Sequence, residues 1–178
     1  DASLNFGFEG KNENLLSENL YFETVSKTDT SVTMRLNASN GGHLDFVYKL
    51  LPNSYMVDFS IQASDMQNFF SPSTKTVSVD WKQRARQMEK GYTFEQRYTS
   101  LTYKPVDDSF DYLSETKDEK ETIPEVLDWV AFKNQYFSCV FIAEQNFEKA
   151  TLESKMEQKG SGYMKNYQAD MQTAFDPT

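Results

Sequence analysis

The sequence predicts an all-β fold, and three observations carry this prediction. Apolar residues alternate with polar ones over short segments, which is the period of a strand with one buried face. Turn-forming residues separate these segments. Hydrophobic residues make up 38% and aromatic residues 15% of the 178-residue chain, enough to fill the interior of a folded domain. Many short strands with turns between them are typical of a β-sandwich.

The clearest pattern lies in the first half of the chain. Segments 31–38 and 43–50 alternate with period two, and Ser39-Asn40-Gly41-Gly42 between them supplies a turn. A second turn, at 51–54, leads into 56–61, where the apolar residues again fall on one side. We therefore expect a three-stranded meander with one buried face.

The flanking segments repeat the same period. Further strands are expected at residues 20–22, 77–81, 101–103, 110–113, 150–154 and 167–171. The pair 101–103 and 110–113 is expected to form a hairpin across a turn at 105–108. The exception is residues 82–90, where helix formers precede Gly91, a typical C-terminal stop. We expect one short helix there.

The net charge restricts the classes of partner. The chain carries 27 acidic and 18 basic residues, a formal net charge of −9. A nucleic acid backbone would be repelled on average, and so would an anionic membrane leaflet, so we expect no nucleic acid partner. No apolar run approaches the roughly 20 residues that a membrane span needs. The acidic run at 115–121 lacks the glycine and ligand spacing of a calcium loop, and we interpret it as a solvated connection.

Little in the chain suggests catalysis. One cysteine permits no intramolecular disulfide, and with one histidine a zinc site would need carboxylates almost alone. That histidine, His43, follows a Gly-Gly turn and is interpreted as a polar turn residue rather than a triad member. A glycosidase pair stays open, because its carboxylate separation of about 5 to 9 Å is set by the fold. We predict that the chain is not an enzyme, with no catalytic residue, metal, cofactor or small-molecule substrate.

Residues 128–142, DWVAFKNQYFSCVFI, concentrate aromatic rings and contain the single cysteine. Both halves, on either side of Lys133-Asn134-Gln135, are rich in strand-forming residues, and the second is apolar almost throughout. We interpret them as core strands whose rings fill a sandwich, each ring burying on the order of 150 to 250 Å². The alternative is an open platform that stacks on a ligand.

Phe69 and Phe70 precede Ser71-Pro72 in a predicted loop. Exposed together they would form a partner-binding patch. The alternative is that both rings are buried and anchor the loop. We name this pair as the candidate partner-binding residues.

Trp129-Val130-Ala131, followed by Gln135-Tyr136-Phe137, resembles the W-V-A-x-x-x-Q-Y-F segment of the large periplasmic domain of YidC-type membrane protein insertases. Segments 81–91, 99–104 and 111–118 are similar to the Bacteroidetes branch of that family. The resemblance covers residues from about 20 to 150. It implies that residues 1–178 are a single periplasmic domain, a two-sheet β-supersandwich like galactose mutarotase, truncated at its termini. The family-signature residues Trp129, Gln135, Tyr136 and Phe137 are expected to be structural.

The resemblance also implies a function. The family's periplasmic domain assists membrane protein insertion or folding without catalysis, through contacts with translocon components or nascent membrane proteins. Its location is the periplasmic side of the bacterial inner membrane, in a parent protein that is membrane-embedded. Such contacts would use a sheet edge or a hydrophobic cleft.

Two other functions stay open. One is a carbohydrate-binding or carbohydrate-processing β-sandwich, which would expose the rings of Trp129 and Tyr136 beside carboxylates, whereas buried rings would favour the insertase domain. The other is a structural domain without a ligand.

Overall fold

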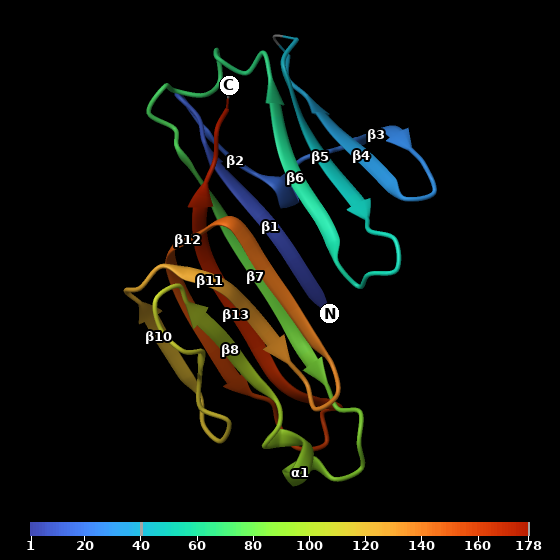
Figure 1. Cartoon of the computed structure of the whole chain (residues 1–178), viewed down its shortest axis with the longest axis vertical. Helices are drawn as coiled ribbons and strands as arrows, with labels where there is room; N and C mark the ends of the chain where they lie inside the picture. Colours follow the sequence, from blue (N-terminus) through green and yellow to red (C-terminus); the bar gives the residue numbers. More distant parts are fainter. Residues whose placement is uncertain (40, 178) are drawn as a thin grey trace. The chain divides into compact units, whose positions relative to one another are not determined.

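The computed structural model describes residues 1–39 and 41–177, and strands dominate this part of the chain. The strands are β1 (Ala2–Glu9), β2 (Asn14–Leu16), β3 (Glu23–Lys27), β4 (Ser31–Asn37), β5 (His43–Leu50), β6 (Val57–Ser64), β7 (Thr76–Arg86), β8 (Ser100–Pro105), β9 (Asp111–Tyr112), β10 (Glu119–Ile123), β11 (Leu127–Lys133), β12 (Ser138–Met156) and β13 (Tyr163–Ala174) (Figure 1). Two sheets and one short α-helix, α1 (Tyr92–Gln96), confirm the predicted all-β fold class.

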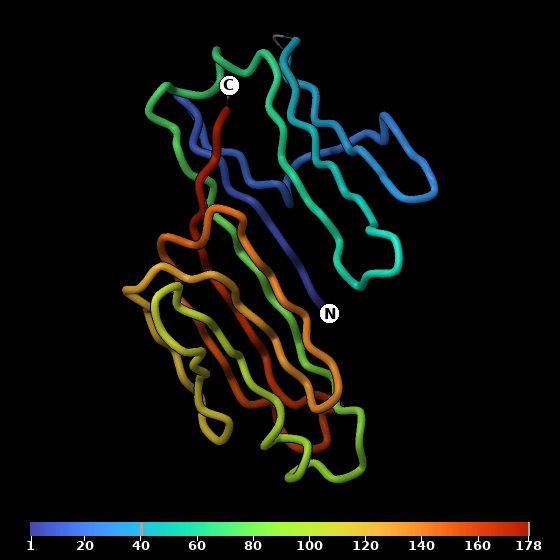
Figure 2. The backbone as a smooth tube through the Cα atoms, in the orientation of Figure 1, coloured from blue at the N-terminus to red at the C-terminus, as the bar shows by residue number. Residues whose placement is uncertain are grey.

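The chain forms two compact units, which the backbone trace in Figure 2 allows the reader to follow. Unit 1 comprises Asp1–Gly7 and Val77–Ala174, and unit 2 comprises Phe8–Thr76 with the residues from Phe175 onward. Strand β1 therefore begins in unit 1 and ends in unit 2. That residues 1–178 make a single domain stays a prediction.

Unit 2 contains the four-stranded antiparallel sheet β3-β4-β5-β6. Its last three strands confirm the predicted meander, with Leu36 opposite Leu44 and Leu44 opposite Ala63. Alternation places one row of apolar side chains on one face and polar ones on the other. The predicted turn at 39–42 includes Asn40, which lies outside the described residues.

The core of unit 2 is a cluster of phenylalanine rings. Phe8 lies 6.4 Å from Phe46, 6.2 Å from Phe70 and 5.4 Å from Phe175, measured between ring centroids. Phe22 packs on Phe46 at 4.6 Å. The prediction of a strand at 20–22 is wrong. This segment links a 3-10 turn (Ser17–Asn19) to β3 and contributes a ring to the core without joining the sheet.

Unit 1 is built on one sheet that folds back on itself. Its strand order is β1-β7-β13-β12-β11-β8-β9, with β10 also paired to β12, and β2 adds to β1 within unit 2. The long strand β12 pairs with β11 through Phe147 and with β13 from Phe147 onward. Asn146 has φ = 63°, and the register with β13 shifts between Phe147 and Lys149. A bulge of this kind bends a strand, so β12 carries the sheet from one layer of the unit to the other (Figure 1).

Two other predictions for unit 1 are confirmed, and a third is confirmed only in part. Strands β8 and β9 form the expected hairpin, with Thr102 opposite Tyr112. The two weakly alternating stretches near the end pair with each other as β12 and β13, with Ala150 opposite Met171. The acidic run at 115–121 is a connection only in its first part, because its last residues enter β10.

The helix forms at a different place from the one expected. Residues up to Arg86 continue β7, in which Gln83 pairs with Ala2 and Ala85 is buried. Pairing with β1 and burial of one face therefore outweigh helix propensity, which is a weak local preference. The helix starts directly after Gly91, so this glycine precedes the helix and does not stop it. No helix in the described residues has both the length and the apolar character to cross a membrane.

Candidate functional site

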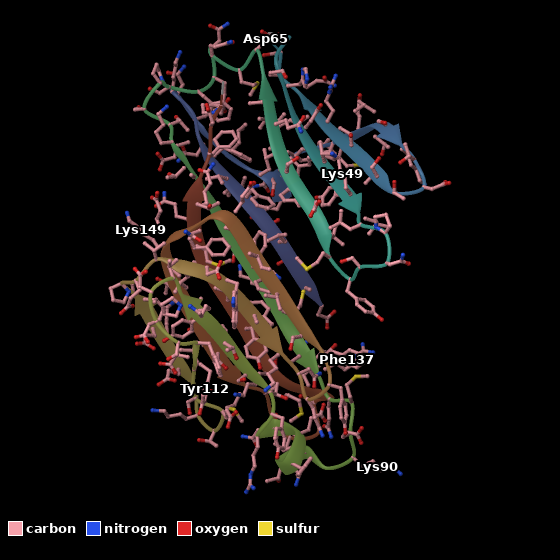
Figure 3. The ribbon with its side chains drawn as sticks, viewed as in Figure 1. Lys49, Asp65, Lys90, Tyr112, Phe137 and Lys149 are labelled. Carbon is pink, nitrogen blue, oxygen red and sulfur yellow. The ribbon has the colours of Figure 1, made fainter. Side chains whose placement is uncertain are left out.

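The loop after β6 contains both candidate partner-binding residues, and the structure separates them. Asp65, labelled in Figure 3, has φ = 53° and opens the loop. The carbonyl of Met66 accepts hydrogen bonds of 2.9 Å from the backbone N–H groups of Phe69 and Phe70. Phe70 is only 2% exposed and packs against Phe175 at 5.3 Å. The ring of Phe70 therefore anchors the loop and is not part of an exposed patch.

Phe69 is half-buried and lines a cavity of about 280 Å³ in unit 2. The cavity is lined by Glu13, Leu15, Leu20, Leu36, Asn37, Ala38, Ser39, Met66, Asn68 and Phe69. Apolar side chains from several segments of unit 2 thus converge beside one ring of the predicted pair. The sequence indicated Phe69 as one of two adjacent aromatic residues in a loop, but the cavity joins segments that are distant in sequence.

Contacts with Gly10 and Lys11 hold the loop that contains Phe69 in place. Lys11 donates from its backbone N–H to the carbonyl of Phe69 at 2.8 Å and from Nζ to the carbonyl of Gln67 at 2.7 Å. A Cβ atom at Gly10 would come within 2.4 Å of Phe69 Cζ and 2.6 Å of the Glu13 carbonyl oxygen. Glycine is therefore required at position 10 for this close approach. The contacts of Gly10 and Lys11 hold the loop that forms one wall of the cavity.

The two edges of the unit 2 sheet differ in how well they are protected. Strand β3 is short, carries Lys27 and has a register shift between Thr24 and Ser26. Strand β6 pairs with β5 over eight consecutive residues, from Val57 to Ser64, without a shift. In the described part of the sheet β6 has no second neighbour. Bulges and lysines discourage added strands, so β6 is the edge better suited to pair with an extended polypeptide.

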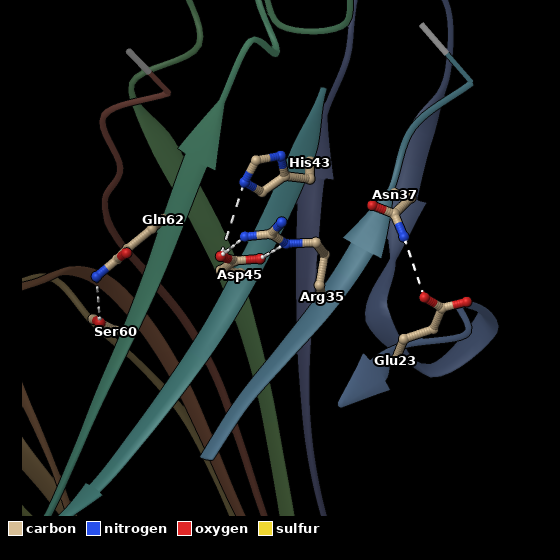
Figure 4. Close-up of polar contacts among 7 residues, drawn as sticks. All are labelled: Glu23, Arg35, Asn37, His43, Asp45, Ser60 and Gln62. Carbon is tan, nitrogen blue, oxygen red and sulfur yellow. Dashed lines mark hydrogen bonds and ion pairs between the residues drawn. The ribbon is translucent and has the colours of Figure 1, made fainter. Parts of the chain in front are cut away.

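The polar face of this sheet carries a side-chain ion pair (Figure 4). Arg35 donates from Nε and Nη2 to the two carboxylate oxygens of Asp45, both at 2.7 Å. The Arg35 guanidinium lowers the pKa of the Asp45 carboxyl group through these bonds and its charge. His43 Nε2 lies 3.9 Å from Asp45 Oδ2. Both oxygens of Asp45 are thus engaged by the guanidinium, which is the arrangement of a structural pair rather than of a hydrolytic triad.

The aromatic segment 128–142 is only partly in the core. Phe132 is 1% exposed and Trp129 is half-buried, but Tyr136 and Phe137 are 64% and 69% exposed in the turn between β11 and β12. Ile142 is also exposed. The expectation that these rings fill the interior, on strands buried on both faces, is therefore wrong for the turn and for the start of β12, because the hairpin turn directs its side chains to solvent.

Hydrogen bonds of Asn134 and of three signature residues, Gln135, Tyr136 and Phe137, close this turn. Asn134 donates from its backbone N–H to the carbonyl of Phe137 at 2.7 Å and from Nδ2 to the carbonyl of Arg86 at 3.1 Å. Gln135 Nε2 donates to the hydroxyl oxygen of Tyr136 at 3.0 Å. These contacts favour a structural role for Gln135, and the assignment of the signature residues as structural stays a prediction.

A buried lysine was not singled out from the sequence. Lys165 on β13 has no exposed surface and donates from Nζ to the carbonyl of Ser114 at 3.0 Å. Burial lowers the pKa of Lys165 to about 8, although Glu115, Asp118 and Glu119 act in the opposite direction. Lys165 and Tyr167 are two residues apart on β13, so their side chains lie on the same face of the strand, and Tyr167 is also fully buried. The alternation along β13 was therefore the sequence signal that could have indicated a buried Lys165.

No group of three or more His, Cys, Asp or Glu side chains in residues 1–39 and 41–177 is placed to hold a metal ion. The candidate site comprises the cavity at Phe69 and the edge of β6.

Comparison with known proteins decides the family. The family described as the YidC periplasmic domain matches residues 2–177. This chain belongs to the YidC periplasmic domain family. The chain is 63% identical over 178 residues to the membrane protein insertase YidC of Phocaeicola vulgatus, and 54% identical over 178 residues to that of Bacteroides fragilis. Each match covers all of the chain and 29% of the relative.

A more distant relative is the membrane protein insertase YidC of Porphyromonas gingivalis, 39% identical over 151 residues, which are 84% of the chain and 24% of the relative. The chain thus spans less than a third of the length of these insertases. The predicted resemblance to the Bacteroidetes branch is confirmed, and so is the location on the periplasmic side of the inner membrane, which is where the YidC periplasmic domain lies.

Proposed function

We propose that this YidC periplasmic domain is a non-catalytic interaction domain that assists membrane protein insertion by binding polypeptide. The ligand is a nascent membrane protein or a translocon component, and the site is the cavity lined by Phe69. The single observation that carries the proposal is this apolar cavity of about 280 Å³, lined by side chains from several segments of unit 2. The relatives, which are membrane protein insertases, supply the context.

The chemistry of the cavity fits an apolar side chain of a polypeptide. Burial of an apolar side chain stabilises the bound state by roughly 25 cal/mol per Å² of apolar surface removed from water. Leu20, Leu36 and Phe69 provide such a surface, while Asn68 and Glu13 offer polar groups at its border. A segment of an unfolded membrane protein exposes many apolar side chains of this kind.

The open edge of β6 offers a second contact for the same class of ligand. An extended segment can add to this edge through its backbone hydrogen bonds, which do not depend on its sequence. Only Asp58 brings a charge to β6, so the edge presents little to repel an apolar chain. Together the cavity and the edge support binding of polypeptides with varied sequences.

Carbohydrate binding is the second candidate, and the exposed ring of Tyr136 is the observation that favours it. The platform expected for it would align Trp129 with Tyr136. Trp129 is half-buried on β11, whereas Tyr136 lies in the turn with its hydroxyl bonded to the amide of Gln135. The two rings therefore differ in environment, and the insertase function has the better support.

Site-specific photocrosslinking in the parent insertase tests the proposal. A photoreactive amino acid at Asn68, on the border of the cavity, is expected to form adducts with newly made membrane proteins or translocon subunits. The matched position is Tyr112 on β9, which is also exposed and lies in unit 1. Phe69→Ser should lower the adduct yield at position 68, and Phe110→Ser, at an exposed ring, should leave it unchanged. Equal yields from positions 68 and 112 would refute the proposal.

A further inference from the structure

The connection between β5 and β6 exposes more apolar surface than a turn requires. Residues 50–57, here called the β5–β6 tip, read LLPNSYMV. Five of them have exposed apolar or aromatic side chains: Leu50, Leu51, Tyr55, Met56 and Val57. Leu50 and Val57 are more than half exposed, at 56% and 53%, and Tyr55 is fully exposed. Contiguous apolar residues on a surface mark an interaction site more often than scattered ones do.

The β5–β6 tip is an ordered structure supported by the neighbouring turn. Leu50 donates from its backbone N–H to the carbonyl of Thr30, at 2.8 Å, in the turn between β3 and β4. Met56 N–H donates to Ser54 Oγ at 3.0 Å. The two connections enclose a groove of about 270 Å³, lined by Lys27, Thr28, Asp29, Thr30, Ser31, Val32, Tyr48, Leu50 and Val57. They lie at the same end of the sheet (Figure 1).

The charge at this end differs from that of the whole chain. Two lysines, Lys27 and Lys49, and two aspartates, Asp29 and Asp58, lie at this end of the sheet. Their formal charges cancel, although the chain carries a net charge of −9. Lys49 is labelled in Figure 3 beside the strand end. The repulsion from an anionic surface is therefore weaker at this end than the net charge of the chain predicts. Lysines beside apolar residues can extend their ammonium groups toward lipid phosphates while their carbon chains stay in apolar surroundings.

We propose that the β5–β6 tip inserts its apolar side chains into the surface of a lipid bilayer and thereby orients unit 2 on the membrane. A bilayer is the apolar surface that lies within reach of a domain on the periplasmic side of the inner membrane. The composition of the tip also fits that surface, because tyrosine is enriched at the level of the lipid headgroups, where its ring is apolar and its hydroxyl is hydrated. Leu51, Tyr55 and Met56 form the part that enters the bilayer.

A fluorescence experiment distinguishes the bilayer from a protein partner. In the parent insertase, Cys139 and any further cysteine are replaced by serine, and Tyr55→Cys then receives an environment-sensitive dye before the protein is reconstituted into vesicles. The matched control is Tyr21→Cys, at another exposed tyrosine of unit 2. We expect a blue-shifted dye at position 55 that nitroxide-labelled lipid quenches, and neither effect at position 21. A dye at position 55 that is shifted but not quenched would show that protein covers the tip, and it would overturn the proposal.

Vesicle flotation of the 178-residue chain gives an independent measurement. With phosphatidylcholine vesicles, the triple substitution Leu51→Ser, Tyr55→Ser and Met56→Ser should lower the bound fraction at least tenfold, whereas Tyr21→Ser should leave it unchanged. Circular dichroism of each variant confirms that the fold is kept. Adding an anionic lipid should change binding little, because the tip is locally neutral. Equal flotation of the triple variant and the unsubstituted chain would refute membrane contact through the tip.

Discussion

Trp81 on β7 stacks on Phe132 of β11, with ring centroids 3.7 Å apart and an interplanar angle of 17°. Their strands are not neighbours, because β13 and β12 lie between them in the sheet order. Tyr167 continues the stack on Phe132 at 5.1 Å and donates from its hydroxyl to the carbonyl of Lys133 at 3.3 Å. The rings thus connect the two layers of the bent sheet, and the closure of unit 1 depends on them.

Phe132→Ala is expected to lower the free energy of unfolding of unit 1 by about 3 to 5 kcal/mol, because it leaves a cavity between the layers. Both tryptophans, Trp81 and Trp129, lie in unit 1, so their fluorescence during urea unfolding reports on this unit. Phe137→Ala is the control, since this ring is exposed and its loss should change stability by no more than about 0.5 kcal/mol. Similar losses in the two variants would contradict the proposed role of the stack.

Gly42→Ala is expected to destabilise unit 2 by about 1 to 3 kcal/mol through overpacking. A Cβ atom at Gly42 would lie 2.4 Å from the carbonyl oxygen of Asp65, and a backbone atom cannot move aside as a side chain can. At Gly91 the nearest atom would be Phe94 Cβ at 3.8 Å, so Gly91→Ala should be tolerated. Hydrogen exchange measures the difference, in β5 and β6 for Gly42→Ala and in β7 and β8 for Gly91→Ala. An equal loss of protection in the two variants would speak against the steric explanation.

The ion pair between Arg35 and Asp45 should make unit 2 sensitive to acid. The pKa of Asp45 is lowered in the folded state, so the unfolded chain takes up this proton first as the pH falls. The stabilisation is therefore complete above the unfolded-state pKa of about 3.9 and is lost as the pH falls below it. Arg35→Met should reduce hydrogen-exchange protection of β4 and β5 at neutral pH, and the difference from the unsubstituted chain should shrink in acid. A difference independent of pH would exclude this origin.

The meander of unit 2 could be predicted because its determinants are local. The turn between β5 and β6 and the period of both strands together fix which residues oppose each other, and Phe46 opposes Ile61 as the alternation requires. The helix position failed because the partner of Gln83 is Ala2, near the start of the chain, and no local pattern reveals such a pairing. Strand content is thus readable from the sequence, whereas pairing over long distances is not.

The candidate site could be predicted only in part. Phe69 was found because an apolar pair in a loop is unusual, but the sequence could not show that Phe70 turns into the core while Phe69 lines a cavity. The exposure of Tyr136 was missed because composition does not reveal on which side of a turn a ring lies. The sequence predicted the turn before β6, but it did not reveal that the apolar side chains of this turn are exposed. These properties depend on packing between segments distant in sequence.

Lys165 should make the stability of unit 1 rise with pH in the alkaline range. Its folded-state pKa is about 8, whereas a lysine in an unfolded chain has a pKa of about 10.4. Between these values the unfolded state binds more protons than the folded state, so the free energy of unfolding increases with pH, by up to about 3 kcal/mol. Below pH 8 both states carry the proton, and the cost of burying the ammonium group is present in full.

Lys165→Met removes this titration while keeping the volume of the side chain, so the rise between about pH 8 and pH 10 should disappear. At pH 7 the variant is expected to be at least as stable as the unsubstituted chain, because the loss of the bond to the carbonyl of Ser114 is offset by removal of a buried charge. Lys120→Met on the exposed side of β10 is the control and should keep the rise. Urea unfolding followed by tryptophan fluorescence at several pH values measures all three proteins. If Lys165→Met kept the alkaline rise, another group would be its source, and the buried ammonium of Lys165 would not limit the stability of unit 1.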